Sequence, residues 1–113
     1  MVTVTITRNT KGKIIQFEGA GHSEFAKSGE DIVCAAVSSL LQTTIKGLEE
    51  YVQVNLEISK EKGHLKVRIK EIKQESIQLL TDAILETLVL GLRAIEKEYR
   101  KYMKLIERRK KNE

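Results

Sequence analysis

Hydrophobic and polar residues alternate along four stretches of the chain, and this alternation predicts four β-strands. A strand with one buried face shows such a period of two. Turn-forming sequences, NTKG and SKEKG, separate the first stretch from the second and the third from the fourth, which indicates two hairpins. The predicted strands are residues 2–8, 13–18, 52–58 and 64–72.

Two further segments repeat apolar residues every three or four positions, which is typical of helices. The first runs from Asp31 to about Glu50. Its inward residues are Val33, Val37, Leu40, Leu41, Thr44, Ile45 and Leu48. The second runs from about Glu75 to Lys110. Its second half forms a heptad seam of Leu85, Leu88, Leu92, Ile95, Tyr99, Tyr102 and Ile106.

The second helix would be long for this chain. About 35 residues at 1.5 Å each give roughly 50 Å, which exceeds the width of a domain of this size. Residues 83–92 are apolar on nearly every side and need cover from more than one direction. We therefore predict a homodimer in which the last helices take part.

The element order ββαββα predicts an α+β fold, with a mostly antiparallel four-stranded sheet and two helices, the C-terminal one long. A chain of 113 residues is expected to form one domain. We predict a single domain over residues 1–113. Residues 101–113 would be the basic end of the last helix.

The composition indicates the cellular compartment and which kinds of site the chain can form. A single cysteine cannot form an intramolecular disulfide, which indicates a reducing cytoplasm. The first residues lack a continuous hydrophobic stretch, and the longest uncharged apolar run, residues 87–92, is too short for a bilayer. We expect no membrane contact. One cysteine and two distant histidines fall short of a structural zinc set, so we expect neither a metal nor another cofactor.

The formal net charge is +4, and much of the excess lies in the C-terminal tail. Such a tail can contact RNA phosphates, or it can be a solvated helix end beside the negative end of the helix dipole. Together with the outward Lys66, Arg68 and Lys70, the basic tail supports one candidate function. In this candidate function the protein is a non-catalytic, ribosome-associated RNA-binding or assembly module.

Cys34 is the candidate nucleophile. Counted from an N-cap at Glu30 or Asp31, it falls in the first turn of its helix. The first amides of a helix lack internal partners and carry the positive end of the dipole, which stabilises a thiolate. The same amides can receive an oxyanion when the thiolate attacks a carbonyl.

Three other residues are candidate partners for Cys34. His22 lies 12 residues upstream on a glycine-bearing loop, from which it can reach Cys34 as a general base. Ser38 lies four residues after Cys34 on the same helix face. Asp31 either caps the helix or orients the imidazole. The residues alone leave plainer alternatives open: a buried Cys34, an exposed His22, and structural roles for Asp31 and Ser38.

The stretch GHSEFAKSGEDIVCAAVSSL resembles the signature of the ribosomal-processing cysteine protease family, Prp. In that signature a Gly-His pair is followed by GEDIVCAAVS. The match covers Gly21 and His22, and then Gly29 through Ser38 without a gap. Element order and length agree as well.

The resemblance implies a bacterial endopeptidase that acts as a homodimer, and it makes residues 1–113 a single cysteine-protease-like domain. Its substrate would be a large-subunit ribosomal protein, the twenty-seventh in that series, from which it removes a short N-terminal extension after aromatic residues. The resemblance assigns Cys34 as the nucleophile and His22 as the general base, with Asp31 and Ser38 as supporting residues. The flanks of a substrate-covering loop would be Gly21 and Gly29.

The loop itself departs from the family pattern. Ser23, Glu24 and Phe25 stand where the family often has small residues and a tyrosine. We expect Phe25 and the apolar helix face to wall a pocket for an aromatic substrate side chain, and we expect the loop to bring His22 to Cys34 when substrate binds.

Overall fold

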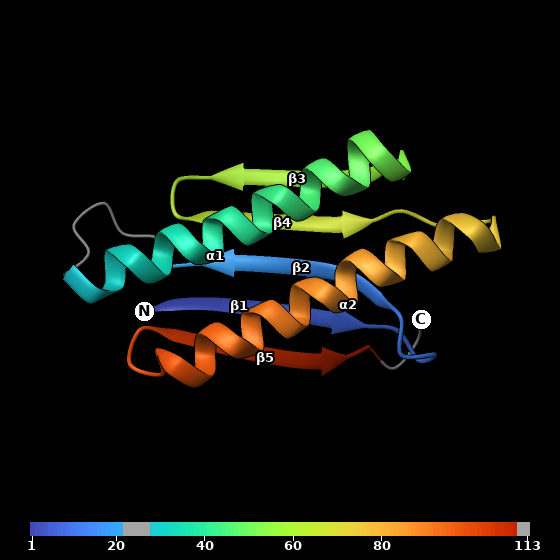
Figure 1. Cartoon of the computed structure of the whole chain (residues 1–113). Coiled ribbons are helices and arrows are strands. Elements are labelled where there is room, and N and C mark those ends of the chain that lie inside the picture. Colours follow the sequence, from blue (N-terminus) through green and yellow to red (C-terminus); the bar gives the residue numbers. More distant parts are fainter. Residues whose placement is uncertain (22–27, 111–113) are drawn as a thin grey trace.

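The computed structural model describes residues 1–21 and 28–110, with only the course of the backbone for residues 28–31. Figure 1 shows the elements in chain order. They are β1 (Val2–Arg8), β2 (Ile14–Ala20), α1 (Ser28–Lys46), the π-helical segment η1 (Gly47–Val52), β3 (Leu56–Glu61), β4 (His64–Ile69), α2 (Glu75–Glu98) and β5 (Met103–Arg109).

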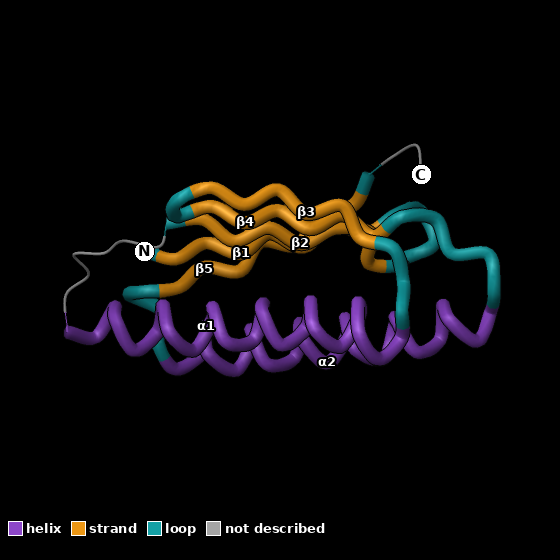
Figure 2. The backbone as a smooth tube through the Cα atoms, turned by 90° about the horizontal axis from the view of Figure 1, so that it is seen from above, coloured by secondary structure: helices purple, strands orange, loops and turns teal. Residues whose placement is uncertain are grey.

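The strands form one five-stranded sheet in the order β3-β4-β2-β1-β5. Neighbouring strands are antiparallel except β5, which runs parallel to β1. Both helices lie on the same face of this sheet, as Figure 2 shows. The fold is therefore α+β with two helices, as predicted.

The hydrophobic core lies between the sheet and the two helices. Residues predicted to face inward are buried in the central strands, since Val4 and Val67 are both fully inaccessible to solvent. The inward residues predicted for the first helix are also buried, apart from Leu40, which is partly buried against the core. The alternating pattern and the helical period thus correctly predicted which residues of these elements are buried.

The predicted sheet of four strands is wrong, because the last predicted helix ends early. Helix α2 stops at Glu98, and a turn leads into β5. The residues predicted as the basic end of a helix are therefore mostly an edge strand. Tyr99, Tyr102 and Ile106 do not continue the heptad seam, because the free edge of β1 offers a parallel partner, from Val2↔Met103 to Arg8↔Arg109.

The third predicted strand is also misplaced. Residues 52–55 precede β3, and η1 carries the first helix on to Val52. Gln53 then has a φ of 64°, in the left-handed region. Val52 and Val54 are buried as expected, but Ile58 on the edge strand is 40% exposed. The alternating pattern at Val52 and Val54 therefore comes from the end of a helix and the turn that follows it, not from a strand. Strands β2 and β4 differ from prediction only at their ends.

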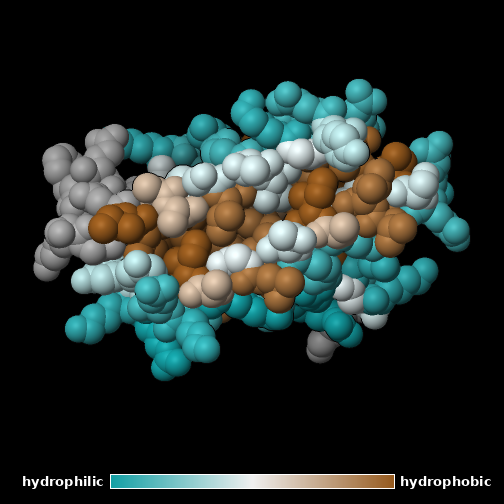
Figure 3. Space-filling model, viewed as in Figure 1, coloured by the Kyte–Doolittle hydropathy of each residue, from teal (hydrophilic) through white to brown (hydrophobic). Residues whose placement is uncertain are grey.

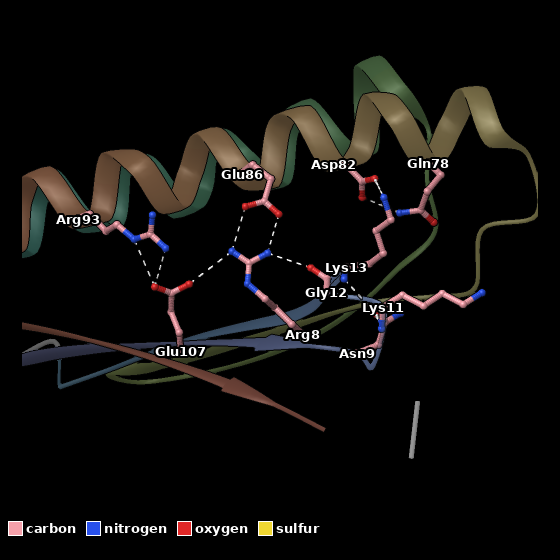
Figure 4. A network of polar contacts seen from close by, with 10 residues as sticks. All are labelled: Arg8, Asn9, Lys11, Gly12, Lys13, Gln78, Asp82, Glu86, Arg93 and Glu107. Atoms are coloured by element: carbon pink, nitrogen blue, oxygen red, sulfur yellow. Dashed lines mark hydrogen bonds and ion pairs between the residues drawn. The ribbon is translucent and has the colours of Figure 1, made fainter. Parts of the chain in front are cut away.

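A network of ion pairs ties α2 to the sheet (Figure 4). Arg8 of β1 donates to both carboxylate oxygens of Glu86, at 2.6 and 2.9 Å, and to the carbonyl oxygen of Gly12 at 3.0 Å. Glu107 of β5 accepts hydrogen bonds from Arg8 and Arg93. These carboxylates raise the pKa of Arg8, chiefly through the hydrogen bond to Glu86. The network ties α2 to β1 and β5.

Candidate functional site

Cys34 lies on the sheet-facing side of α1, near its N-terminal end. Its thiol is free, and the residue is partly buried against the hydrophobic core. Val33 and Val37 on either side are fully buried. Cys34 therefore lies where the core meets the surface.

The predicted position of Cys34 in the first turn is wrong. Helix α1 begins at Ser28, so Cys34 is its seventh residue and lies in the second turn. The amides without intrahelical partners are those of the first turn, and the effect of the dipole falls off within it. Unpaired amides of α1 are therefore not adjacent to Cys34.

Ser38 lies one turn beyond Cys34 on the same face, as predicted, and it is half-buried. It opens onto a cavity of about 210 Å³ between α1 and the β3–β4 hairpin. The lining residues are Ser38, Leu41, Gln42, Lys60, Glu61, Gly63, His64 and Leu65. The structure thus places a hollow beside the candidate nucleophile.

Gly21 is held at the end of β2. Its N–H donates to the carbonyl oxygen of Gly63 at 3.1 Å, and its φ is 93°. A Cβ added to Gly21 would overlap the carbonyl oxygen of Met1. Only glycine fits this backbone without strain. The chain therefore leaves the sheet, directly before His22 in the sequence, from a fixed point.

Several predicted site residues cannot be placed. His22 and Phe25 lie outside the described residues, as does the expected movement of their loop. Gly29 and Asp31 belong to the first turn of α1, where only the backbone is described. The structure brings Cys34, Ser38 and the hairpin turn together. Whether His22 and Asp31 complete the group stays a prediction.

The second histidine, His64, begins β4 and is not a freely solvated residue. Its Nε2 contacts the carboxylate of Glu18 on β2, and its side chain is 36% exposed. This pair holds the two strands together at the end of the sheet where Gly21 lies. The interaction gives His64 a structural partner rather than a place beside Cys34.

Sequence patterns missed the hairpin side of the cavity. Lys60 comes from a predicted turn and Leu65 from a strand predicted only as part of a sheet, and no local signal shows that they would lie near Ser38. Among the described residues, no cluster of three or more histidine, cysteine or acidic side chains could hold a metal ion. No helix in that part of the chain is long and apolar enough to cross a membrane.

Comparison with known proteins identifies relatives along nearly the whole chain. The family described as Cysteine protease Prp matches residues 1–104. The Ribosomal processing cysteine protease Prp of Staphylococcus aureus strain Mu50 is 31% identical over 107 residues, covering 93% of this chain and 97% of the relative.

Two crystal structures of the S. aureus protease Prp share the fold. The complex with a substrate peptide has a TM-score of 0.83 at 28% identity, covering 95% of this chain and 99% of that chain. The complex with a covalently linked product peptide has a TM-score of 0.81 with the same identity and coverage. From its sequence and its fold, the chain belongs to the Prp family of cysteine proteases.

Proposed function

We propose that this protein is a cysteine endopeptidase that removes the N-terminal extension of a large-subunit ribosomal protein, the twenty-seventh in that series. The observation that carries the proposal is the position of Cys34, a free and partly buried cysteine on α1, one helical turn before Ser38, which lines a hollow of about 210 Å³. Membership of the family and the peptide complexes of a relative support the same function.

In the proposed mechanism, His22 takes the proton of the Cys34 thiol, and the thiolate attacks the carbonyl carbon of the scissile peptide bond. The tetrahedral intermediate then collapses: the C–N bond breaks, and the imidazolium donates its proton to the departing amine. A thioester joins Cys34 to the N-terminal fragment. Water, deprotonated by His22, hydrolyses this thioester and restores the thiol. Atoms and protons balance without a cofactor.

Asp31 and Ser38 are proposed to support this dyad. The Ser38 hydroxyl lies one turn from the sulfur, within reach of a bound peptide group. Asp31 lies one turn before it on the same helix. Loss of either side chain should lower kcat more than it raises KM, because neither would bind much of the substrate. Ser38→Ala and Asp31→Asn, compared by kcat and KM, test the two roles separately.

The central experiment uses a peptide that copies the extended N-terminus of the host's own ribosomal protein. Incubated with the enzyme, it should be cut at one bond, as read by mass spectrometry. Cys34→Ala should abolish the cut and leave the thermal unfolding curve nearly unchanged, since the residue is only partly buried and the change removes a single sulfur atom. Cleavage that survives Cys34→Ala would contradict the proposal.

We also propose a homodimer formed through the helix layer. Between α1 and α2 lies an apolar groove of about 430 Å³. Its lining is Leu40, Thr43, Thr44, Gly47, Ala83, Ile84, Thr87 and Leu88. A continuous apolar band crosses this face (Figure 3), and Leu80 and Leu90 are 43% and 62% exposed. A second copy of the chain would bury this band, because large exposed apolar patches mark protein–protein interaction sites.

Light scattering should therefore give about twice the 12.9 kDa mass of one chain. Leu80→Glu should shift the protein toward monomers, because it would bury a carboxylate in the interface. Lys66→Glu, on the opposite face of the sheet, is the matched control and should leave the mass unchanged. A monomeric wild type at micromolar concentration would rule the dimer out.

The alternative RNA-binding function has less support. Lys66 and Arg68 do face outward on β4, but Arg68 pairs with Glu57, and Arg108 of β5 donates to Thr7. The charge of Arg68 thus has a partner within the chain. An RNA surface would require affinity that falls steeply with salt. Salt-sensitive binding without peptide cleavage would favour that alternative.

A further inference from the structure

A second polar cavity lies where α2 ends and β5 begins. Its volume is about 370 Å³, and its lining is Met1, Glu96, Lys97, Arg100, Met103 and Lys104. Figure 1 shows the first residue of the chain beside the turn between α2 and β5, where the Val2 N–H donates to the Tyr102 carbonyl oxygen. Sites for small molecules have volumes of about 300–1,000 Å³. The cavity is therefore large enough for a ligand, and neither the proposed cleavage nor the proposed dimer uses it.

The lining of this cavity carries more positive than negative charge. Lys97, Arg100 and Lys104 supply three cations, and all three residues are exposed. Within the described part of the chain, no carboxylate pairs with any of these three side chains. Their positive charges are therefore available to a ligand.

Glu96 is the one acidic residue of the lining, and it faces the backbone of β5. Its carboxylate accepts the hydrogen bond from the Leu105 N–H at 2.6 Å. This bond directs the carboxylate to the edge of the sheet. Even with Glu96 counted in full, the lining keeps an excess of two positive charges. An anionic ligand is thus favoured over a neutral or a cationic one.

The end of the helix explains only part of this cluster. Lys97 lies in the last turn of α2 and Arg100 follows it, where the negative end of the helix dipole favours cations. The carbonyl oxygen of Ile95 in that turn already accepts the Tyr99 N–H. Lys104 belongs to β5, so the dipole gives no reason for its charge at the same cavity. The convergence of helix, turn and strand on one hollow calls for a ligand.

The residue types indicate a chain of phosphates. The Arg100 guanidinium presents its N–H donors as a fork that matches two phosphate oxygens, and lysine ammonium groups bind phosphate as point charges. A single carboxylate would balance only one of the cations, whereas a triphosphate brings several negative charges close together. Met1 and Met103 are the only uncharged residues of the lining, and Met103 is 1% exposed. Recognition would therefore depend on the phosphates.

We propose that the cavity formed by Met1, the end of α2 and the start of β5 binds the triphosphate chain of a small molecule, either a nucleoside triphosphate or a free polyphosphate. This site goes beyond the proposed protease function and does not depend on it. A bound chain would also steady the first residue, because Met1 lines the cavity and its carbonyl oxygen lies against Gly21.

The test measures binding by isothermal titration calorimetry, with tripolyphosphate and ATP as probes, without divalent cations and at constant ionic strength. Wild type should bind both probes. Arg100→Gln and Lys104→Gln should each weaken the binding about tenfold or more, because each removes a charged contact. Lys66→Gln is the matched control, since Lys66 is an exposed strand lysine on β4 outside the cavity. Its affinities should equal those of wild type.

The two probes distinguish the two sources of the phosphate chain. Tighter binding of ATP would identify a nucleotide as the ligand, and equal or weaker binding of ATP would identify a free polyphosphate; both results support the site. A wild type that binds neither probe at millimolar concentration would overturn the site. Equal losses of affinity in Lys104→Gln and Lys66→Gln would also overturn it, because they would show attraction to the net charge alone.

Thermal unfolding separates a binding site from a structural role of these cations. With tripolyphosphate at about a hundred times its Kd, the wild-type midpoint should rise by about 5 °C or more, because only the folded chain binds. Lys104→Gln should lose most of this rise, and its midpoint without the probe should match that of wild type. An equal rise in both proteins would overturn the proposal.

Discussion

At the scale of single residues, close backbone contacts constrain the site as much as its reactive groups do. Gly21 lies against the Met1 carbonyl and is tied to Gly63. Gly12 also has a positive φ, of 84°, but an added Cβ there would meet only the end of the Arg109 side chain at 3.5 Å. The two glycines share a conformation and differ in what surrounds them.

Gly21→Ala should therefore destabilise the protein more than Gly12→Ala. Both variants carry the strain of a left-handed backbone, about 1–2 kcal/mol, and Gly21→Ala adds an overlap with backbone, of about 1–3 kcal/mol. Urea unfolding midpoints measure the difference. Peptide cleavage should fall further in Gly21→Ala as well, since the chain segment leading to His22 must shift. Equal losses of stability would show that the Met1 contact gives way at little cost.

At the scale of elements, the decisive feature is β5. Met103 is 1% exposed in the core, whereas Ile106 on the same strand is 37% exposed on the open face. The edge of β5 is protected by α2, because Glu96 accepts a hydrogen bond from the Leu105 N–H at 2.6 Å. A side chain of the preceding helix thus satisfies one amide at the edge of the sheet, where unpaired amides would invite aggregation.

Met103→Ala is expected to cost about 2–5 kcal/mol of unfolding free energy, as for other large core residues. Ile106→Ala is the matched control on the same strand, and its cost should stay below about 1 kcal/mol, because surface changes are small. Denaturant titration of both variants checks this. Similar, small effects would indicate a solvated C-terminal segment, as the sequence pattern had suggested.

The contact between α2 and β5 should also depend on pH. Hydrogen bonds from Arg93, followed by the effects of Arg8, lower the pKa of Glu107 below its ordinary value of 4.5, against the opposing effect of burial. A lowered folded-state pKa contributes stability above the unfolded pKa and loses it as pH falls through the folded one. The stability difference between wild type and Glu107→Gln should hold above about pH 5 and shrink on acidification below 4.5.

At the scale of the whole molecule, the sheet has one covered face and one open face. Both helices, the cavity beside Cys34 and the apolar groove lie on the covered side. The open side presents the hydroxyl-bearing Thr3 and Thr5 of β1 and the charged residues of β4. Catalysis and dimer formation, as proposed, would therefore share the helix layer and leave the polar face to solvent.

That arrangement predicts a coupling between assembly and stability. If the helix layer forms the dimer, the thermal midpoint of the wild type should rise with protein concentration, because association stabilises only the folded chain. Leu80→Glu should melt at a midpoint independent of concentration. Differential scanning calorimetry over about a hundredfold range of protein concentration measures the thermal midpoints of the wild type and of Leu80→Glu. A wild-type midpoint that does not move would contradict assembly through any face.

The sequence by itself determined the α+β class, the inward faces of the central strands and helices, and the candidate nucleophile. These depend on local periodicity and on a contiguous motif, which residues within one or two turns or strands define. Val33, Val37 and Leu41 had to be buried wherever their helix packed. Cys34, four residues before Ser38, had to share its face.

Only the tertiary structure decided the fate of the last segment and the shape of the cavity. Residues 103–109 satisfy both a helical and a strand pattern, and the free edge of β1, about a hundred residues away, selects the strand. The cavity needs residues of α1 and of a hairpin that lie 18 to 27 positions further along the chain. The strand and the cavity both depend on contacts between segments that are distant in the sequence. A local sequence pattern does not report the free energy of such contacts.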